Sequence, residues 1–147
     1  EIYVTGDYSY RSEYSAVDGL VLAGDAFSFL DPVFSSGVYL ALKSGEMVAD
    51  AAHEAIQSGD CSAQVFEEYS EDVCRAIEAM RKLVYAFYDE NFSFGQLLKK
   101  YPHLRGDLTD CLIGHLLKDF TELFDAVAEF ADVPAPLPHG RPRVNAP

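Results

Sequence analysis

The chain has 147 residues, a formal net charge of −13 and a hydrophobic content of 49%. This length fits one domain or part of a larger one, and the negative charge disfavours nucleic acids and anionic membranes as partners, because both would repel the chain. No apolar run reaches the roughly 18 residues of a spanning helix, and the opening EIYVTGDYSY does not resemble a signal peptide. The three cysteines form no CxxC pair or metal-ligand pattern, so we expect free thiols in a cytoplasmic protein that binds no metal.

The first predicted elements are short strands that lead to a polar break. Alternating residues predict one or two strands over residues 2–12, and the apolar run of residues 20–23 predicts a strand covered on both faces. That strand ends at Gly24 and Asp25. A carboxylate at the end of a buried strand needs hydrogen-bond donors, since an unpaired buried charge is costly. Hydroxyl groups of a bound ligand would serve as such donors.

An apolar loop and a helix follow this break. Pro32 disfavours helix at Asp31 and predicts an extended or turning path. Ser35, Ser36 and Gly37 precede a run with helical period, which predicts a helix over residues 36–58 with a serine at its N-cap. The free N–H groups and positive dipole end of this helix suit a carbonyl oxygen or a small anion. Its predicted inward face has small residues in the middle and consists of positions that are alternately four and three residues apart: Val38, Leu42, Gly45, Ala49, Ala52 and Ile56.

The rest of the chain predicts further helices and a tail. Apolar residues repeat by threes and fours over residues 63–88 and 108–131, and we expect one helix in each range. A shorter helix is expected over residues 94–101, where Pro102 stops it. In the first long helix, Glu78 and Lys82 are spaced as an exposed i,i+4 ion pair. Five prolines among residues 132–147 predict an extended or disordered tail.

The segment GDAFSFLDPVFSSGVYLALKSG, with DYSYRSE upstream, resembles the second flavin-binding motif of the FAD-dependent monooxygenase superfamily. Its DPVFSSG form is more similar to the flavin-dependent halogenases than to the aromatic hydroxylases. The resemblance implies FAD as cofactor, with the Asp25 carboxylate holding a ribityl hydroxyl and the backbone from Ser35 to Val38 facing the pyrimidine edge of the flavin ring. The cofactor-binding residues that it implies are Gly24, Asp25, Asp31, Pro32, Ser35, Ser36, Gly37 and Val38.

The implied fold is mainly α with a small β portion, as the C-terminal fragment of an FAD-binding α/β flavoprotein that is Rossmann-like and of the para-hydroxybenzoate-hydroxylase type. The sequence does not contain the GxGxxG turn that seats the pyrophosphate in such folds. We therefore expect this turn, and the catalytic residues, upstream of Glu1. Residues 1–58 would be the C-terminal part of the FAD-binding domain, residues 59–131 a helical region and residues 132–147 a proline-rich tail.

The resemblance implies that the parent protein is an enzyme that uses reduced FAD, oxygen and a halide to halogenate an aromatic or other electron-rich small molecule. Its other partners would be a flavin reductase or NAD(P)H as electron source, and it could form a homo-oligomer. An FAD-dependent hydroxylase or a geranylgeranyl-reductase-type oxidoreductase is one alternative, because the same motif serves both. The other alternative is a non-catalytic helical module, in which the small-residue helix face would lie bare and invite dimerisation. The chain alone is expected to be inactive.

Overall fold

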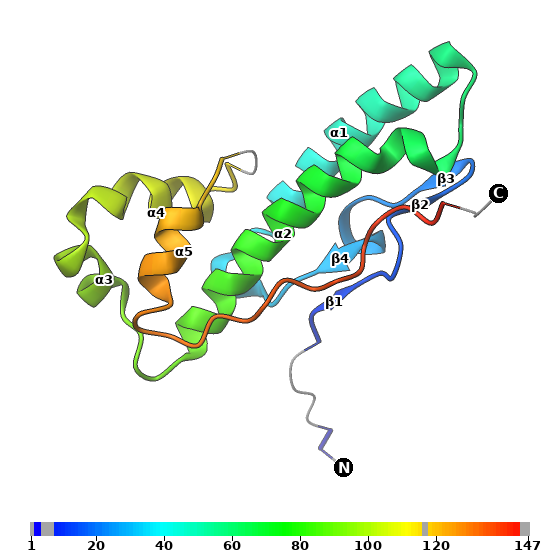
Figure 1. Cartoon of the computed structure of the whole chain (residues 1–147). Coiled ribbons are helices and arrows are strands. Elements are labelled where there is room, and N and C mark those ends of the chain that lie inside the picture. The colour runs from blue at the N-terminus through cyan, green and yellow to red at the C-terminus, as the bar shows by residue number, and fades with distance from the viewer. Residues whose placement is uncertain (1, 4–7, 116–117, 145–147) are drawn as a thin grey trace. The chain divides into compact units, whose positions relative to one another are not determined.

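A computed structural model describes residues 2–3, 8–115 and 118–144 (Figure 1). The described part is mostly helical with two small two-stranded sheets, which confirms the predicted mainly α chain with a small β portion. The chain divides into two compact units: unit 1 comprises Glu1–Cys74 with Pro138–Pro147, and unit 2 comprises Arg75–Leu137. Helix α2 (Glu67–Tyr88) and the C-terminal segment each contribute residues to both units.

Both sheets belong to unit 1. Each is an antiparallel pair: β1 (Tyr10–Arg11) with β4 (Ser28–Phe29), and β2 (Ala16–Val17) with β3 (Leu20–Val21). Residues 4–7, which are part of the predicted N-terminal strands, lie outside the described residues. The prediction of a strand covered on both faces over residues 20–23 is wrong, because β3 has two residues and Leu20 is 54% exposed. In this short hairpin Ala16 belongs to a small core with Ala55 and Phe66, and the partly buried Val21 packs against it.

Helix α1 (Gly37–Ser58) ends where the sequence predicts, at Gly59, whose φ of 73° is the left-handed conformation common after helices. The helix buries Ser44 and Ala55, each 3% exposed. The predicted inward face is instead exposed, at 75%, 71% and 71% for Val38, Leu42 and Ile56. The prediction of that face as inward is therefore wrong for this chain, because periodicity groups residues on one face but does not say what that face meets.

The last described residues of unit 1 pair with the chain that leads into β2. Backbone hydrogen bonds run from Gly140 N–H to Glu13 O (2.8 Å), from Ser15 N–H to Arg141 O (3.2 Å) and from Arg143 N–H to Ala16 O (2.8 Å). Tyr14 and Arg141 form a parallel bridge. Of the two predicted states of the tail, extended and disordered, the structure shows the extended one over these residues.

We expect Gly140→Ala to lower the free energy of unfolding by about 1–2 kcal/mol, the cost of forcing a side chain into the left-handed region. Gly140 has a φ of 100°, and a Cβ there would lie 3.0 Å from Arg11 Nε and 3.2 Å from Cys74 Sγ. Urea unfolding followed by circular dichroism measures the effect. The matched control is Gly106→Ala in helix α4 (Arg105–Leu112), where a Cβ meets nothing within 4 Å and the expected effect is neutral or stabilising.

Unit 2 comprises the second part of α2 and helices α3 (Phe94–Lys100), α4 and α5 (Thr121–Val127). Pro102 follows the end of α3, as the sequence predicts. The most deeply buried side chains of unit 2 are aliphatic, at Met80, Leu83, Leu97, Leu104, Leu123 and Val127, and the rings of Phe120 and Phe124 are also buried. In α2, the apolar residues spaced three and four positions apart therefore do identify buried positions, unlike those of α1.

The prediction of a single helix over residues 108–131 is wrong. Helix α4 ends at Leu112, and Gly114, with a φ of 81°, turns the chain out of the helix. Helix α5 begins at Thr121, whose N–H and hydroxyl both donate to the Asp119 carboxylate, at 2.9 and 2.6 Å. A left-handed glycine thus follows α4, and Asp119, which directly precedes the N-cap residue Phe120, binds Thr121 at the start of α5. The apolar repeat runs through both breaks.

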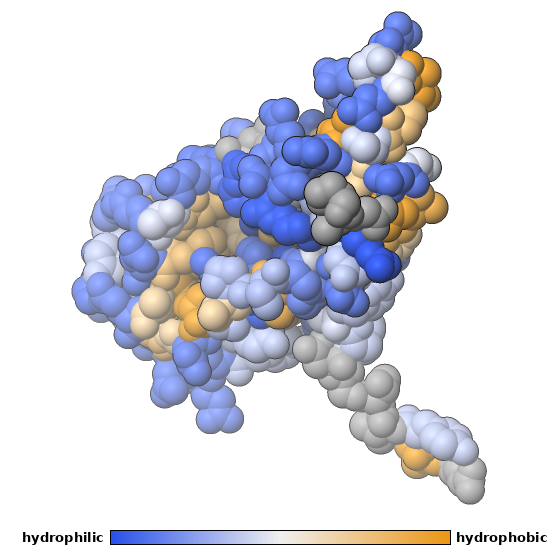
Figure 2. Space-filling model, turned by 45° about the vertical axis from the view of Figure 1, so that its right-hand side comes forward, coloured by the Kyte–Doolittle hydropathy of each residue, from blue (hydrophilic) through white to orange (hydrophobic). Residues whose placement is uncertain are grey.

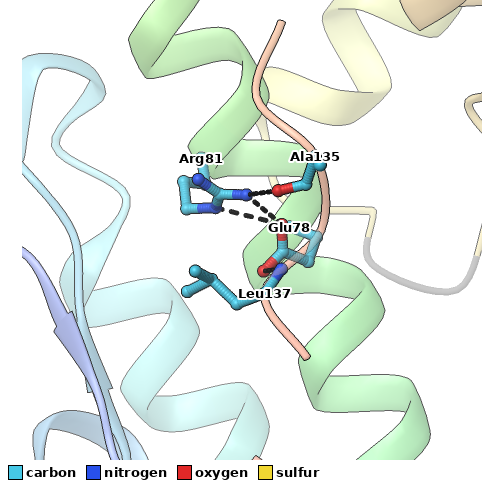
Figure 3. Close-up of polar contacts among 4 residues, drawn as sticks. All are labelled: Glu78, Arg81, Ala135 and Leu137. Atoms are coloured by element: carbon cyan, nitrogen blue, oxygen red, sulfur yellow. Dashed lines mark hydrogen bonds and ion pairs between the residues drawn. The ribbon is translucent and has the colours of Figure 1, made fainter. Parts of the chain in front are cut away.

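Glu78 does not form the predicted surface pair with Lys82. Glu78 is 9% exposed and Arg81 is 8% exposed, and Arg81 donates to Glu78 Oε2 from Nε at 3.0 Å and from Nη2 at 2.8 Å. Nη2 also donates to the Ala135 carbonyl, and Glu78 Oε1 accepts the Leu137 N–H at 3.2 Å (Figure 3). This buried pair holds the extended segment at residues 135–137 to α2 within unit 2.

Candidate functional site

The site begins at the turn formed by Gly24. Its φ of 53° is left-handed, and a Cβ there would lie 3.2 Å from Ala41 Cβ of α1, so both the conformation and the close approach require glycine. Its N–H donates to Ser44 Oγ at 2.9 Å, and that hydroxyl donates to the Ala41 carbonyl at 3.1 Å. The buried Ser44 therefore fixes the turn against the second turn of α1.

The backbone and the side chain of Asp25 have different roles. The Asp25 carbonyl accepts a hydrogen bond from the Tyr10 hydroxyl, and the Tyr10 ring stacks on Phe29 with centroids 6.3 Å apart. Phe27, 1% exposed, anchors the chain after the turn. The residue Asp25 itself is exposed, and among the described residues its carboxylate has no hydrogen-bond or ion-pair partner. The carboxylate is thus available to a ligand while the backbone that carries it is held.

Asp31 and Pro32 shape the loop that leads to α1. Asp31 Oδ1 accepts the Val33 N–H at 3.1 Å and so caps the short 3-10 turn Pro32–Phe34. The Asp31 N–H donates to Ser9 Oγ at 3.0 Å. Ser35 follows with a φ of 54°, a left-handed conformation unusual for a residue with a side chain. In this arrangement Asp31 supports the loop itself.

The N-terminus of α1 lies directly after this loop. Ser36 occupies the N-cap position, as predicted, but its hydroxyl makes no cap hydrogen bond. Its carbonyl accepts the Leu40 N–H at 2.9 Å, which leaves the N–H groups of residues 37–39 without partners inside the helix. Gly37 and Val38 are exposed, so the positive end of a 22-residue helix is accessible there.

The turn at Gly24, the loop at Asp31 and Pro32 and the start of α1 all lie in unit 1, in the segment that the sequence indicated. Tyr10 and Ser44 are two supporting residues that the sequence did not single out, although DYSYRSE and KSG contain them. No group of three metal-ligating side chains occurs among the described residues. In the same part of the chain, no helix is both long and apolar enough to cross a membrane.

We expect Ser44→Ala to lower the free energy of unfolding by about 1 kcal/mol, because the Gly24 N–H loses its acceptor. Chemical unfolding of the purified chain measures this loss. Ser58→Ala is the matched control, because the Ser58 hydroxyl donates to the Ala55 carbonyl at the exposed end of the same helix. Its removal should lower the free energy of unfolding by less than about 0.5 kcal/mol. Equal unfolding free energies for wild type and Ser44→Ala would contradict the role given to Ser44.

Comparison with known proteins finds relatives among flavin-dependent enzymes, although no family model matches the chain. Over 108 residues, 74% of the chain, it is 33% identical to a 1H-pyrrole-2-carbonyl peptidyl-carrier-protein chlorinase of Pseudomonas fluorescens. Over 59 residues, 40% of the chain, it is 42% identical to a digeranylgeranylglycerophospholipid reductase of Methanosarcina acetivorans. Among solved structures, the flavin-dependent brominase Bmp2 matches 84% of the chain with a TM-score of 0.71 and 32% identity.

The chain spans only part of each of these proteins: 24% of the chlorinase, 14% of the reductase and 30% of the brominase chain. The likeness to the two halogenating enzymes extends over most of this chain, in sequence and in structure, whereas the reductase match is confined to less than half of it. The chain is therefore a flavin-dependent halogenase-like protein.

Proposed function

We propose that the chain forms one wall of an FAD site in a flavin-dependent halogenase. The observation that carries this proposal is the Gly24 turn, which is fixed to α1 by Ser44 and presents an exposed Asp25 carboxylate. A carboxylate with free lone pairs suits ligand hydroxyl groups, and the accessible N–H groups at the start of α1 suit a negatively charged edge. The residues present therefore fit a flavin with a hydroxylated side chain.

The proposed roles follow from these donors and acceptors. Asp25 accepts a hydrogen bond from a ribityl hydroxyl, and the N–H groups of Gly37 and Val38 face the pyrimidine edge of the flavin. Gly24, Asp31 and Pro32 give the backbone its path, and Ser35 and Ser36 bring it to the helix start. Reduced FAD, when bound, would give two electrons to oxygen, and the oxygen activated in this way would take two more from a halide and so oxidise it. This chain's own contribution is to bind and orient the flavin and to stabilise negative charge on it.

We further propose that residues 1–58 are the C-terminal part of a Rossmann-like FAD-binding domain, followed by a helical region at 59–131 and a proline-rich tail at 132–147. The catalytic residues would then lie outside this chain. The name of the chlorinase relative describes a pyrrole carbonyl group on a peptidyl carrier protein. An electron-rich aromatic group is accordingly the proposed substrate class, with a halide and a flavin reductase or NAD(P)H as the other partners.

The test uses the full-length protein as its gene encodes it. We expect it to bind FAD in a titration and, with reduced flavin, oxygen and chloride or bromide, to add halogen to a pyrrole or phenol, detected by mass spectrometry. A colourless protein that binds no FAD would refute the flavin site. FAD binding with hydroxylation and no halogen incorporation would instead favour a hydroxylase.

A reductase of isoprenoid chains is the second candidate, and the match to the reductase of Methanosarcina acetivorans favours it. Such an enzyme needs no oxygen, so saturation of a geranylgeranyl chain under strictly anaerobic conditions would support it over the halogenase. The non-catalytic alternative predicts a protein without bound flavin and without either activity. The same FAD titration and the two assays therefore separate all three candidates.

A further inference from the structure

The tyrosines of this chain bear on the proposed halogenation, because a phenol ring is itself an electron-rich aromatic group. The chain contains nine tyrosines and no tryptophan. On the face drawn in Figure 2 much of the surface is hydrophilic, in keeping with the net charge of −13. The carboxylates that give this charge do not react with electrophilic halogen, whereas an exposed phenol does. A tyrosine that is exposed beside the flavin site would therefore meet the reagent that the enzyme makes.

Tyr10 connects the proposed flavin site to the surface. It lies in β1 directly opposite Phe29 of β4, and the two rings stack on one face of this strand pair. The Tyr10 carbonyl accepts a hydrogen bond from Ser28 Oγ at 3.0 Å, and the Tyr10 hydroxyl donates to the Asp25 carbonyl. The side chain is thus fixed at both ends, yet the residue is 50% exposed. A small electrophile can reach this ring one hydrogen bond away from Asp25.

Two other tyrosines form a matched set with Tyr10. Tyr8 is 51% exposed and stacks on the same Phe29 ring, with centroids 5.5 Å apart, but its hydroxyl makes no hydrogen bond among the described residues. Tyr69 has a hydroxyl that donates to the Leu22 carbonyl at 2.6 Å, but the residue is only 4% exposed. Of the three, Tyr10 combines exposure with a hydroxyl that donates to a carbonyl.

Exposure and this hydrogen bond both favour halogenation of the Tyr10 ring. A hydroxyl that donates a hydrogen bond carries more negative charge on its oxygen, and a phenol shares that charge with the ring carbons beside the hydroxyl. One of these carbons supplies the electron pair of the new carbon–halogen bond, while the halogen–oxygen bond of a hypohalous acid breaks with its electrons on oxygen. The proton that leaves the ring joins the released hydroxide as water. The step needs no oxidant besides the hypohalous acid that halide oxidation supplies.

We propose that Tyr10 is a self-halogenation site of the parent enzyme: when no substrate is present, the hypohalous acid that the enzyme forms halogenates the Tyr10 ring beside its hydroxyl. This inference rests on the proposed function. The added halogen lies next to the O–H that holds the Asp25 carbonyl, so it crowds that hydrogen bond. Weakening of the bond loosens the turn that presents the Asp25 carboxylate, and flavin binding weakens with it. The enzyme thus slows itself when nothing else consumes its hypohalous acid.

A first experiment treats the full-length protein with dilute hypobromite and so requires no enzyme activity. Thiols are first blocked with N-ethylmaleimide, because the exposed Cys61 would otherwise consume the reagent. Peptide mass spectrometry locates bromine by its paired isotope peaks. We expect bromine to enter Tyr10 at least about twofold faster than Tyr8, because only the Tyr10 hydroxyl is polarised by a hydrogen bond, and to be absent from the buried Tyr69. Equal rates at Tyr10 and Tyr8 would overturn the assignment.

A second experiment lets the full-length protein make its own reagent from reduced flavin, oxygen and bromide. Without substrate, we expect more bromine at Tyr10 than at Tyr88, although Tyr88 is the more exposed residue, and excess pyrrole should divert the bromine from Tyr10 to itself. The brominated protein should bind FAD about threefold to tenfold more weakly, the effect of losing one hydrogen bond. Tyr10→Phe removes the phenol and should lose no FAD affinity during the incubation. Tyr8→Phe is the matched control and should lose it as wild type does.

The outcomes separate this inference from the proposed function. Bromination of pyrrole with an unmodified Tyr10, or with Tyr88 modified first, would refute self-halogenation at Tyr10 and leave the proposed function standing. Bromine at Tyr10 with unchanged FAD affinity would contradict the loosening of the turn. If the enzyme brominates neither pyrrole nor tyrosine while added hypobromite still modifies Tyr10, the proposed function fails and self-halogenation fails with it, whereas the reactivity of Tyr10 stands.

Discussion

Replacing Arg81 by methionine is expected to lower the free energy of unfolding by about 3–5 kcal/mol, the typical cost of removing one partner of a buried ion pair. Arg81 gives Glu78 two charge-assisted hydrogen bonds and gives the Ala135 carbonyl a third (Figure 3). Methionine fills a similar volume but leaves the Glu78 carboxylate buried beside an uncharged side chain. The segment at residues 135–137 would lose one of its two attachments to this pair.

Chemical unfolding followed by circular dichroism measures this loss. Lys99→Met, at an exposed position of α3, applies the same exchange where no buried partner is lost and should change stability by less than about 0.5 kcal/mol. The double variant Glu78→Leu/Arg81→Met removes both charges and should be more stable than Arg81→Met alone. Wild-type stability of Arg81→Met would show that the pair is not buried in solution.

The pair at Glu78 and Arg81 also shows what the sequence could not reveal. Spacing on a helix gives the relative direction of side chains, and the sequence therefore predicts an exposed ion pair between Glu78 and Lys82. The structure buries the pair because the chain returns 54–59 residues later and places Ala135 against Arg81 and Leu137 against Glu78. A contact of that sequence separation has no local signal.

The difference between local signals and contacts that are distant in sequence also applies to the helices and to the site. A glycine marks the end of α1 at Gly59 and also follows the end of α4 at Gly114, but the apolar repeat through residues 108–131 continues past Gly114 and predicts a single helix. In the site, Gly24, Asp25 and Asp31 were visible because consecutive residues carry the motif. Tyr10 and Ser44 were missed because they act on the turn from 15 and 20 residues away.

Replacing Asp25 by alanine is expected to weaken the binding of FAD to the full-length protein by about ten- to a hundredfold, the range for losing a hydrogen bond to a charged group. A fluorescence titration of FAD measures the dissociation constant. Asp25→Asn keeps one acceptor oxygen and should lose less. Asp50→Asn, an exposed carboxylate on the polar side of α1, is the matched control and should leave the dissociation constant unchanged.

This experiment separates a binding role of Asp25 from a structural one. The turn is held by the Asp25 carbonyl, which accepts from the Tyr10 hydroxyl, and by the Gly24 N–H, which donates to Ser44. Neither bond uses the Asp25 carboxylate, so Asp25→Ala should unfold at the same urea concentration as wild type. Weaker FAD binding at unchanged stability would assign the carboxylate to the flavin. Unchanged FAD binding would contradict that assignment, and lower stability would show that the exposed carboxylate supports the fold.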